Sequence, residues 1–506
     1  MNRASRPEAD RPSYVLGVLV AVYVANFVDR QVLSILNEEI KRDLALSDGE
    51  MGFLYGTAFA VFYALFGVPL GRLADLWVRR SLIAASVAVW SAMTTLSGLA
   101  RNFGELAAAR IGVGVGEAGA SPAAFSLLSD LYPPARRATA LAIYSSGIYI
   151  GSGLSLLVGG EIVGRWDAAF AAGGAPLGLR GWQAAFFAVG LPGLLLAIWV
   201  GTLREPRRGA LDGAPPVPND ARPFAAFGRE LAAVIPPFTL LSLFAAGAGA
   251  RRIAANAAAA AAIALAAGGL VRATGNAAQW IALGVGVYAA FSWAQALRLR
   301  DPASARVILD TPTLRWSAVG FALLAFTGYG LGYWIPPFFL RVHHVPIGRV
   351  GLWVGATAAV AGWLGVTAGG VLGDALRRRT PLGRLWVAGA GALLPLPLVP
   401  WMLGTASTPL ALVLNFPVSV ASAMWVGVGA ATVQNLVPPR MRGTASAAYL
   451  LVITFIGLAL GPYTIGKLSD WLGLRAAMLW GLTVNVAALG CLLMAARHLR
   501  RDEVAR

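Results

Sequence analysis

An arginine and a glutamate stand two helical turns apart inside an apolar stretch of this chain, in the segment Arg110-Ile-Gly-Val-Gly-Val-Gly-Glu117. Spacings of four and seven residues place Arg110, Gly114 and Glu117 on one face of a helix. A charge at bilayer depth costs about 2.5–3.5 kcal/mol on insertion scales, so such a side chain persists where it faces a watery cavity or an opposite charge. The pair therefore predicts a pathway for a polar or charged species across a membrane.

The composition of the whole chain is that of a polytopic membrane protein. Of 506 residues, 57% are hydrophobic and only 13% are charged, whereas soluble domains have about 25% charged residues. The net charge of +17 does not indicate nucleic-acid binding, because the arginines follow apolar runs on alternate sides, as basic residues do at the cytoplasmic surface of membranes. The single cysteine, Cys491, excludes an intrachain disulfide.

Apolar runs long enough to span a bilayer recur along the chain. The first six lie near 14–36, 51–70, 82–100, 106–128, 139–163 and 182–202, and a second six lie near 316–339, 350–373, 385–404, 410–436, 443–466 and 474–496. Arginines cluster in the loops on one side, while the loop near 405–409 on the other side has no Lys or Arg. Both termini are therefore expected in the cytoplasm.

The region between the two sets predicts a different organisation. A Pro- and Gly-rich stretch follows Arg204-Glu205-Pro206-Arg207-Arg208 and indicates a cytoplasmic linker. Two further spans are expected at 253–271 and 278–297. The related basic loops of the two halves are expected on the same side of the membrane, so an even number of membrane crossings must separate the halves. The stretch 231–248 holds Pro236-Pro237 and predicts a helix lying in the membrane interface. The expected total is fourteen spanning helices, and the expected domains are 1–203, 204–312 and 313–506.

Two pairs of loop sequences recur between the two sets of spans. Gly71-Arg-Leu-Ala-Asp75-Leu-Trp-Val-Arg79-Arg80 matches Gly370-Val-Leu-Gly-Asp374-Ala-Leu-Arg-Arg378-Arg379. Leu131-Tyr-Pro-Pro-Ala-Arg-Arg-Ala-Thr-Ala matches Leu436-Val-Pro-Pro-Arg-Met-Arg-Gly-Thr-Ala at nearly the same separation. The two matches predict two six-helix halves related by an axis along the membrane normal, with a binding site at the midplane between them.

The first of these loops resembles motif A of the major facilitator superfamily. Asp75 follows a helix and precedes two arginines, so it can pair with an arginine or cap a neighbouring helix and latch the halves together in one state. The alternative is a basic loop that only sets the topology. The expected latch residues are Gly71, Asp75, Arg79, Arg80, Asp374 and Arg378.

Three stretches resemble the Spinster-like branch of that superfamily. They are Asn26-Phe-Val-Asp29-Arg30, then Arg110–Glu117 continuing to Ser129-Asp130, and Gly151-Ser-Gly153 with Arg204-Glu205-Pro206. The second half matches at superfamily level, and the pair 253–297 is extra to the usual twelve-helix plan. The resemblance implies an all-α major facilitator fold and a transporter, without a cofactor, of a lipid-like or amphiphilic small molecule. The Ala- and Arg-rich, Lys-poor composition favours a bacterial inner membrane, and a monomer is expected.

Ionisable residues of the first and fourth spans carry a hypothesis of proton coupling. From the helical rise, Asp29 and Arg110 lie at similar depth, roughly 8–10 Å below the outer surface, and this geometry allows a salt bridge between them. Glu117 lies roughly 18 Å down, close to the level of Asn26. Asp29 and Glu117 are expected to carry protons, because a carboxylate whose arginine partner comes and goes changes its proton affinity. Asn26, Arg30 and Arg110 are expected to bind the substrate.

Several alternatives stay open from the sequence. The same charged residues are also consistent with a permanent network that orients two helices. Tyr329 and Tyr333 suit either the binding site or an interfacial aromatic belt. His343-His344 lack further ligands, so no metal site is expected, and without a nucleotide-binding or catalytic motif the chain is not expected to be an enzyme. A facilitator or exporter of a polar substrate and an uncoupled lipid scramblase are the competing functions.

Overall fold

The structure, a computed structural model, describes residues 10–208, 211, 222–438 and 441–504, and every regular element in this part of the chain is helical. The first half holds α1 (Pro12–Ile35), α2 (Asn37–Leu44), α3 (Asp48–Tyr55), α4 (Thr57–Leu76), α5 (Arg79–Ser97), α6 (Phe103–Glu117), α7 (Ala120–Leu131), α8 (Pro134–Ala169), the short 3-10 helix η1 (Pro176–Gly178) and α9 (Gly181–Gly201). The middle region holds α10 (Pro223–Val234), α11 (Phe238–Ala245), α12 (Ala250–Thr274), α13 (Ala277–Arg300) and α14 (Pro302–Asp310).

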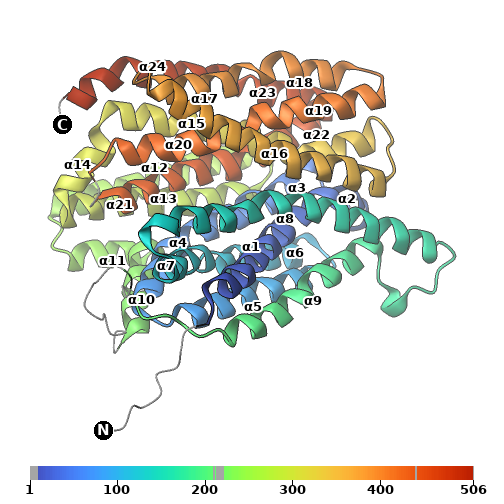
Figure 1. Ribbon diagram of the computed structural model, residues 1–506, viewed down its shortest axis with the longest axis horizontal. Coiled ribbons are helices and arrows are strands. Elements are labelled where there is room, and N and C mark those ends of the chain that lie inside the picture. Colours follow the sequence, from blue (N-terminus) through green and yellow to red (C-terminus); the bar gives the residue numbers. More distant parts are fainter. Residues whose placement is uncertain (1–9, 209–210, 212–221, 439–440, 505–506) are drawn as a thin grey trace, which may run out of the picture.

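The second half repeats the plan of the first. It holds α15 (Pro312–Arg341), α16 (Ile347–Arg377), α17 (Gly383–Leu393), α18 (Pro395–Gly404), α19 (Thr408–Ala423), α20 (Trp425–Asn435), α21 (Arg442–Val452), the π-helical turn η3 (Ile453–Ala459), α22 (Leu460–Leu472), α23 (Leu474–Leu482) and α24 (Val484–Val504). In Figure 1 the first half lies below and the second half above, and their helices run roughly side by side.

The two ends of the bundle differ, and the difference positions the site. Asp10 accepts a hydrogen bond from the backbone N–H of Arg204, and Asp502 accepts one from Thr313. The first and last helices of each half therefore meet at one end, called here the terminal end, on the left of Figure 1. The opposite end, which carries α2 and the loop after α15, is called the distal end.

The expected spans and fold class are confirmed. Within the described residues, thirteen helices or helix pairs have the length and apolar composition to cross a membrane, and they include both extra helices, α12 and α13. Helix α5 is not among the thirteen, but it packs against α6 and α9 in the place of the third span. The stretch expected as one interfacial helix is instead the pair α10 and α11, which are bent by 108° at Pro236-Pro237. The interfacial location of that pair and the domain boundaries stay predictions.

Glycines allow the two halves to approach backbone to backbone where α8 meets α16. A Cβ added at Gly153 would lie 2.5 Å from the carbonyl oxygen of Gly355, and one added at Gly355 would lie 2.6 Å from that of Gly153. One level further, a Cβ at Gly351 would lie 2.4 Å from the carbonyl oxygen of Leu156. Small residues permit this close packing in membranes, where no hydrophobic effect drives helices together. The contact between the halves therefore depends on these glycines.

Replacing Gly355 with Val is expected to lower the melting temperature of the purified protein, because overpacking a close contact costs about 1–3 kcal/mol. Gly370→Val on the same helix is the matched control, since an added Cβ at Gly370 meets no atom within 4 Å. Thermal unfolding of both variants in detergent checks this. Equal melting temperatures for the two variants would contradict the assigned contact.

Candidate functional site: a buried charge pair between two helices

The central feature of the site is an ion pair between α1 and α6. The guanidinium of Arg30 donates from Nε to Oε2 of Glu117 over 3.1 Å, and its Nη2 bonds the same oxygen. The Glu117 carboxylate is wholly buried, and the Arg30 side chain is 11% exposed. Glu117 is the last residue of α6, and α6 and α7 form one span because Ala118 and Gly119 between them keep helical dihedral angles. A buried carboxylate is costly unless it is paired, so the guanidinium compensates this charge.

Aromatic rings surround the Arg30 guanidinium. Its carbon lies 4.8 Å from the ring centroid of Phe27, 4.4 Å from that of Phe59 and 5.4 Å from that of Tyr63. Tyr329 of α15 interacts electrostatically with Arg30 from the other half and is partly exposed. Cation–π contacts of this kind stabilise a desolvated cation. The arginine is therefore held by rings as well as by the carboxylate, and it can stay charged when the carboxylate does not.

A second buried arginine lies beside this pair. Arg110 on α6 and Asp29 on α1 are both buried, and Nη1 of Arg110 lies 3.5 Å from the backbone carbonyl oxygen of Asp29. Among the described residues, Nε and Nη2 of Arg110 and Oε1 of Glu117 have no hydrogen-bond partner. Asn26 is also buried and lies close to the Glu117 carboxylate. Some polar atoms of the site are therefore hydrogen-bonded, such as Oε2 of Glu117, while Nε and Nη2 of Arg110 can still donate to a new partner.

The structure brings the expected residues together but pairs them differently from what equal depth allowed. Similar depth allowed a salt bridge between Asp29 and Arg110, whereas the structure pairs Arg30 with Glu117 and directs Arg110 to a backbone oxygen. Depth along a helix does not specify the direction in which a side chain leaves it, and a long arginine side chain bridges several ångströms of depth. All five residues expected from the first and fourth spans nevertheless lie together.

A second charge cluster closes the distal end between the halves. The guanidinium of Arg341, the last residue of α15, makes two bonds to the carboxylate of Asp48 on α3, of 2.5 and 2.6 Å. It also bonds Glu38 on α2 over 2.6 Å. Burial raises the pKa of the Glu38 carboxyl, while Arg341 and Lys41 oppose this rise and Asp48 adds to it. A bidentate arginine–carboxylate pair fixes geometry as well as charge, so the distal closure is a specific contact.

Other distal contacts reinforce this closure. Asp470 on α22 accepts hydrogen bonds from the backbone N–H groups of Asp48, over 2.8 Å, and Gly49, over 3.1 Å. Ser469 donates to the Asp48 carboxylate over 2.6 Å. The first turn of α3 is thus capped by residues of the opposite half, which satisfies donors that a helix start leaves free.

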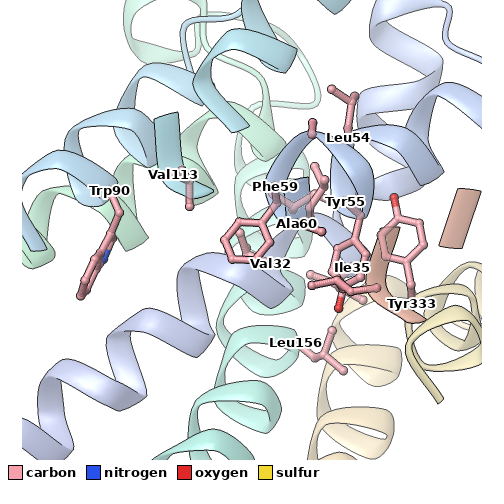
Figure 2. Close-up of a cluster of buried hydrophobic side chains, with 14 of the residues drawn as sticks. Val32, Ile35, Leu54, Tyr55, Phe59, Ala60, Trp90, Val113, Leu156 and Tyr333 are labelled. Atoms are coloured by element: carbon pink, nitrogen blue, oxygen red, sulfur yellow. The ribbon is translucent and has the colours of Figure 1, made fainter. Parts of the chain in front are cut away.

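Tyr333 belongs to the distal closure rather than to the charge pair. Its phenol accepts a 2.6 Å hydrogen bond from Asn37 and donates to the carbonyl oxygen of Met51 over 3.3 Å. Its ring stacks on Tyr55 at 4.2 Å between centroids. Figure 2 shows Tyr333 beside Tyr55 and Ile35, within a cluster that the first half otherwise builds. In this conformation the phenol is committed to contacts between the halves, whereas Tyr329 lies nearer to Arg30.

The residues expected to form a latch make contacts within their own halves. Asp75 is exposed, and its nearest cation is Arg72 of the same helix, at 4.0 Å. Arg79 is buried and pairs with Asp130 and Glu205, both in the first half. In the second half Asp374 pairs with Arg384 over 2.6 Å.

The remaining latch residues also bond locally. The Arg80 side chain donates to the carbonyl oxygen of Leu203 over 2.6 Å. The backbone N–H of Arg378 donates to the carbonyl oxygen of Asp374 over 3.3 Å. A Cβ added at Gly71 would meet no atom within 4 Å. The contacts between halves described above therefore lie toward the distal end, and these latch residues do not bridge the halves in this conformation.

The distal closure was not predicted from the amino-acid sequence. Asp48 lies in Ser47-Asp48-Gly49-Glu50, whose Ser47 and Glu50 form a capping box, and Arg341 follows an apolar run as a topology-setting arginine would. Charges in such loops are usually solvated, so spacing alone does not single them out. The signal that was present is the acid-rich stretch from Glu38 to Glu50, which is unusual for a loop between two spans.

No metal centre is found in the described ranges: they contain no group of three or more His, Cys, Asp or Glu side chains placed to hold an ion. His343 has its Nδ1 3.1 Å from Oγ1 of Thr408, a contact that links α19 to the loop after α15.

Comparisons with known proteins agree with this architecture. A family model described as Major Facilitator Superfamily matches residues 19–462. An MFS-type efflux pump of Mycolicibacterium smegmatis is 28% identical over 99% of this chain and 96% of its own length. A probable galactarate/D-glucarate transporter of Bacillus subtilis is 29% identical over 38% of this chain and 41% of its own length.

A solved structure extends the likeness to the branch indicated by the sequence. It is described as a bacterial homolog to the human lysosomal transporter Spinster in an inward-facing and occupied conformation. It superimposes with a TM-score of 0.73 at 27% identity, and the match covers 99% of both chains. With the family model spanning most of the chain, this protein belongs to the major facilitator superfamily and is a Spinster-like transporter.

Proposed function

We propose that this protein is a proton-coupled secondary active transporter that moves an anionic amphiphile across a bacterial inner membrane by alternating access. The observation that carries the proposal is the buried ion pair of Arg30 and Glu117, which lies beside a second buried arginine. A buried pair of charges is weak evidence for stability, because desolvation offsets much of the attraction. Its presence in a membrane protein is better explained by function.

Exchange of partners supplies the coupling. When Glu117 takes up a proton it loses its attraction for Arg30, which then stays charged among its aromatic rings and binds an anionic head group. Arg110 offers two unpartnered N–H groups close by, and Asp29 is the second proton carrier, held at the same level of α1. Release of the anion favours return of the ionised Glu117 to Arg30, so protonation and substrate binding are linked.

The surroundings of Arg30 support an amphiphile as substrate. Phe27, Phe59 and Tyr63 are aromatic, and Tyr329 adds a further ring from the second half. Rings accept an apolar or aromatic body while Arg30 and Arg110 select a negative charge. The structure named for Spinster supports the same branch of the superfamily, and membrane lipids are then the natural surroundings of the substrate.

The orientation follows from the positive-inside rule. Basic loops lie at the terminal end, so we assign that end and both termini to the cytoplasm. The distal closure is then the outer gate, and the conformation is inward-facing, as in the Spinster-like structure. In the outward-facing state we expect Asp75 and Asp374 to join the halves at the cytoplasmic end, with Gly71, Arg79, Arg80 and Arg378 in support.

A facilitator or exporter of a polar organic acid is the second candidate. The buried Arg110 beside the largely buried Arg30 suits a small carboxylate as well as a lipid head group. A relative named as a probable galactarate/D-glucarate transporter, matched over 38% of this chain, favours this reading. An uncoupled scramblase would differ from both because a proton gradient would not drive it.

Glu117→Gln and Asp29→Asn are expected to abolish uphill accumulation driven by a proton gradient, because neither amide exchanges a proton. Downhill exchange should continue in at least one of them. Uptake into proteoliposomes, with and without an ionophore, measures both. Glu105→Gln, an exposed residue of the same helix α6, is the control and should keep gradient-driven uptake. Full uphill transport by both buried variants would rule out the coupling.

Arg30→Gln is expected to weaken binding of anionic amphiphiles about tenfold or more, since a hydrogen bond to a charged group contributes about 1.5–3 kcal/mol. Thermal shift of the purified protein against lysolipids, fatty acids and sugar acids measures this. An uncharged detergent of the same chain length is the control ligand. Equal shifts by charged and uncharged ligands in the wild type would exclude anion selection.

Acidification is expected to favour the closed outer gate through Glu38. Its pKa is raised by burial in the closed state, so the closed gate binds the proton more tightly than an open, hydrated one. The gain appears as the pH falls through the raised pKa of Glu38 toward the ordinary range of a glutamate carboxyl. The measurement is the rate at which an impermeant maleimide modifies Ser34→Cys under the gate, in a Cys491→Ser chain. The labelling rate of the chain with Glu38, divided by the labelling rate of a Glu38→Gln variant at the same pH, should decrease as the pH decreases. A ratio that stays constant would contradict the role assigned to Glu38.

A further inference from the structure

Helix α13, one of the two extra helices, lies across the seam between the halves. A Cβ added at Gly286 in the middle of α13 would lie 2.9 Å from Cε1 of Phe455, on η3, and 3.2 Å from Cγ1 of Val61, on α4. One residue of the extra helix therefore touches both halves at once. A helix held against both sides of a moving seam must change its contacts when the halves move.

A second contact of α13 lies beside the distal closure. The ring of Trp280 packs edge-on against Tyr463 of α22, with centroids 5.5 Å apart. A Cβ added at Gly49 of α3 would lie 3.1 Å from Nδ2 of Asn276 and 3.0 Å from Oδ2 of Asp470. The start of α13 therefore adjoins the place where Asp470 caps α3 across the two halves.

Gln279 is the unusual residue of this helix. Its side chain is fully buried, and neither its Nε2 nor its Oε1 has a hydrogen-bond partner among the described residues. It shares the buried face of α13 with Leu283 and Gly286, which is the face that meets the seam. A buried amide without partners carries a desolvation penalty, so this residue disfavours the conformation in which the seam is closed around it.

A second buried amide of the extra helices provides the contrast. Asn256 on α12 is equally buried, but it donates to Ser292 over 3.0 Å and to Gln295 over 2.8 Å, and it accepts from Tyr288 over 2.7 Å. These partners all lie on α13. Asn256 therefore joins the extra helices to each other, whereas Gln279 faces the transport halves.

We infer that α13 is a strap across the seam between the halves. The buried amide of Gln279 on this strap sets the balance between the closed and the open state of the distal closure. Opening separates α3 from α22 beside the start of α13, so that the amide of Gln279 gains partners. The penalty in the closed state keeps the gate from becoming too stable to open. The inference rests on the alternating access of the proposed function but requires neither proton coupling nor a particular substrate.

The test uses the full chain in proteoliposomes, with Ser34→Cys as the probe and Cys491→Ser as background. Ser34 is 1% exposed and donates to the carbonyl oxygen of Tyr333 over 2.7 Å, so an impermeant maleimide reaches it from the distal side only when the gate opens. The modification rate then follows the open fraction even when that fraction is small. Gln279→Leu should slow modification about tenfold, and Gln279→Glu should speed it.

Asn256→Leu is the matched control. Like Gln279→Leu, it replaces a fully buried amide with leucine, but at a position away from the seam between the halves. Its modification rate should stay within about twofold of the parent rate. Unchanged rates in both Gln279 variants, or equal slowing by Gln279→Leu and Asn256→Leu, would overturn the inference. Should Gln279→Leu fail to fold, Gln279→Met carries the same expectation with a more adaptable side chain. Uptake assays are not involved, so this result is independent of whether Glu117 couples protons.

Discussion

The ion pair between Arg30 and Glu117 is the interaction on which the interior of the first half depends. It joins α1 to α6 and compensates a carboxylate that is buried inside the bundle. Removing one partner of a buried pair costs about 3–5 kcal/mol, because the other charge is left uncompensated. A protein that must break this pair during its cycle needs a replacement partner, and the proton and the anionic substrate are the two candidates close at hand.

The distal end uses the same chemistry for a different purpose. Arg341, which is partly exposed, and Asp48, which is buried, lie on opposite halves, and their two hydrogen bonds act with the Asp470 cap to hold α3 against α22. Water reaches the partly exposed Arg341 more easily than it reaches the wholly buried Glu117 of the central pair. The outer contact can therefore open and close, while the proposed exchange between proton and substrate takes place at the central pair.

The extra helices add a third layer to this arrangement. Asn256 and its partners make α12 and α13 one unit, and the face of α13 that carries Gly286 rests on both halves. Such a unit contributes to the balance between states without touching the substrate. In these proposals, the residues at the centre of the halves bind the proton and the substrate, and α13 at the seam influences the equilibrium between the closed and open states.

The sequence by itself determined the spans, the repeat and the residues of the charge cluster, because hydropathy and helical spacing are local properties that a bilayer enforces strongly. It could not decide that Glu117 pairs with Arg30 rather than Asp29 with Arg110, because helix rotation is set by packing between helices. It also could not place Arg341 on Asp48, since these residues lie in opposite halves and look like ordinary loop charges. Only the tertiary structure brings them together, along with Gln279 and the seam it faces, because close approach at glycines such as Gly153 and Gly355 determines which helices touch.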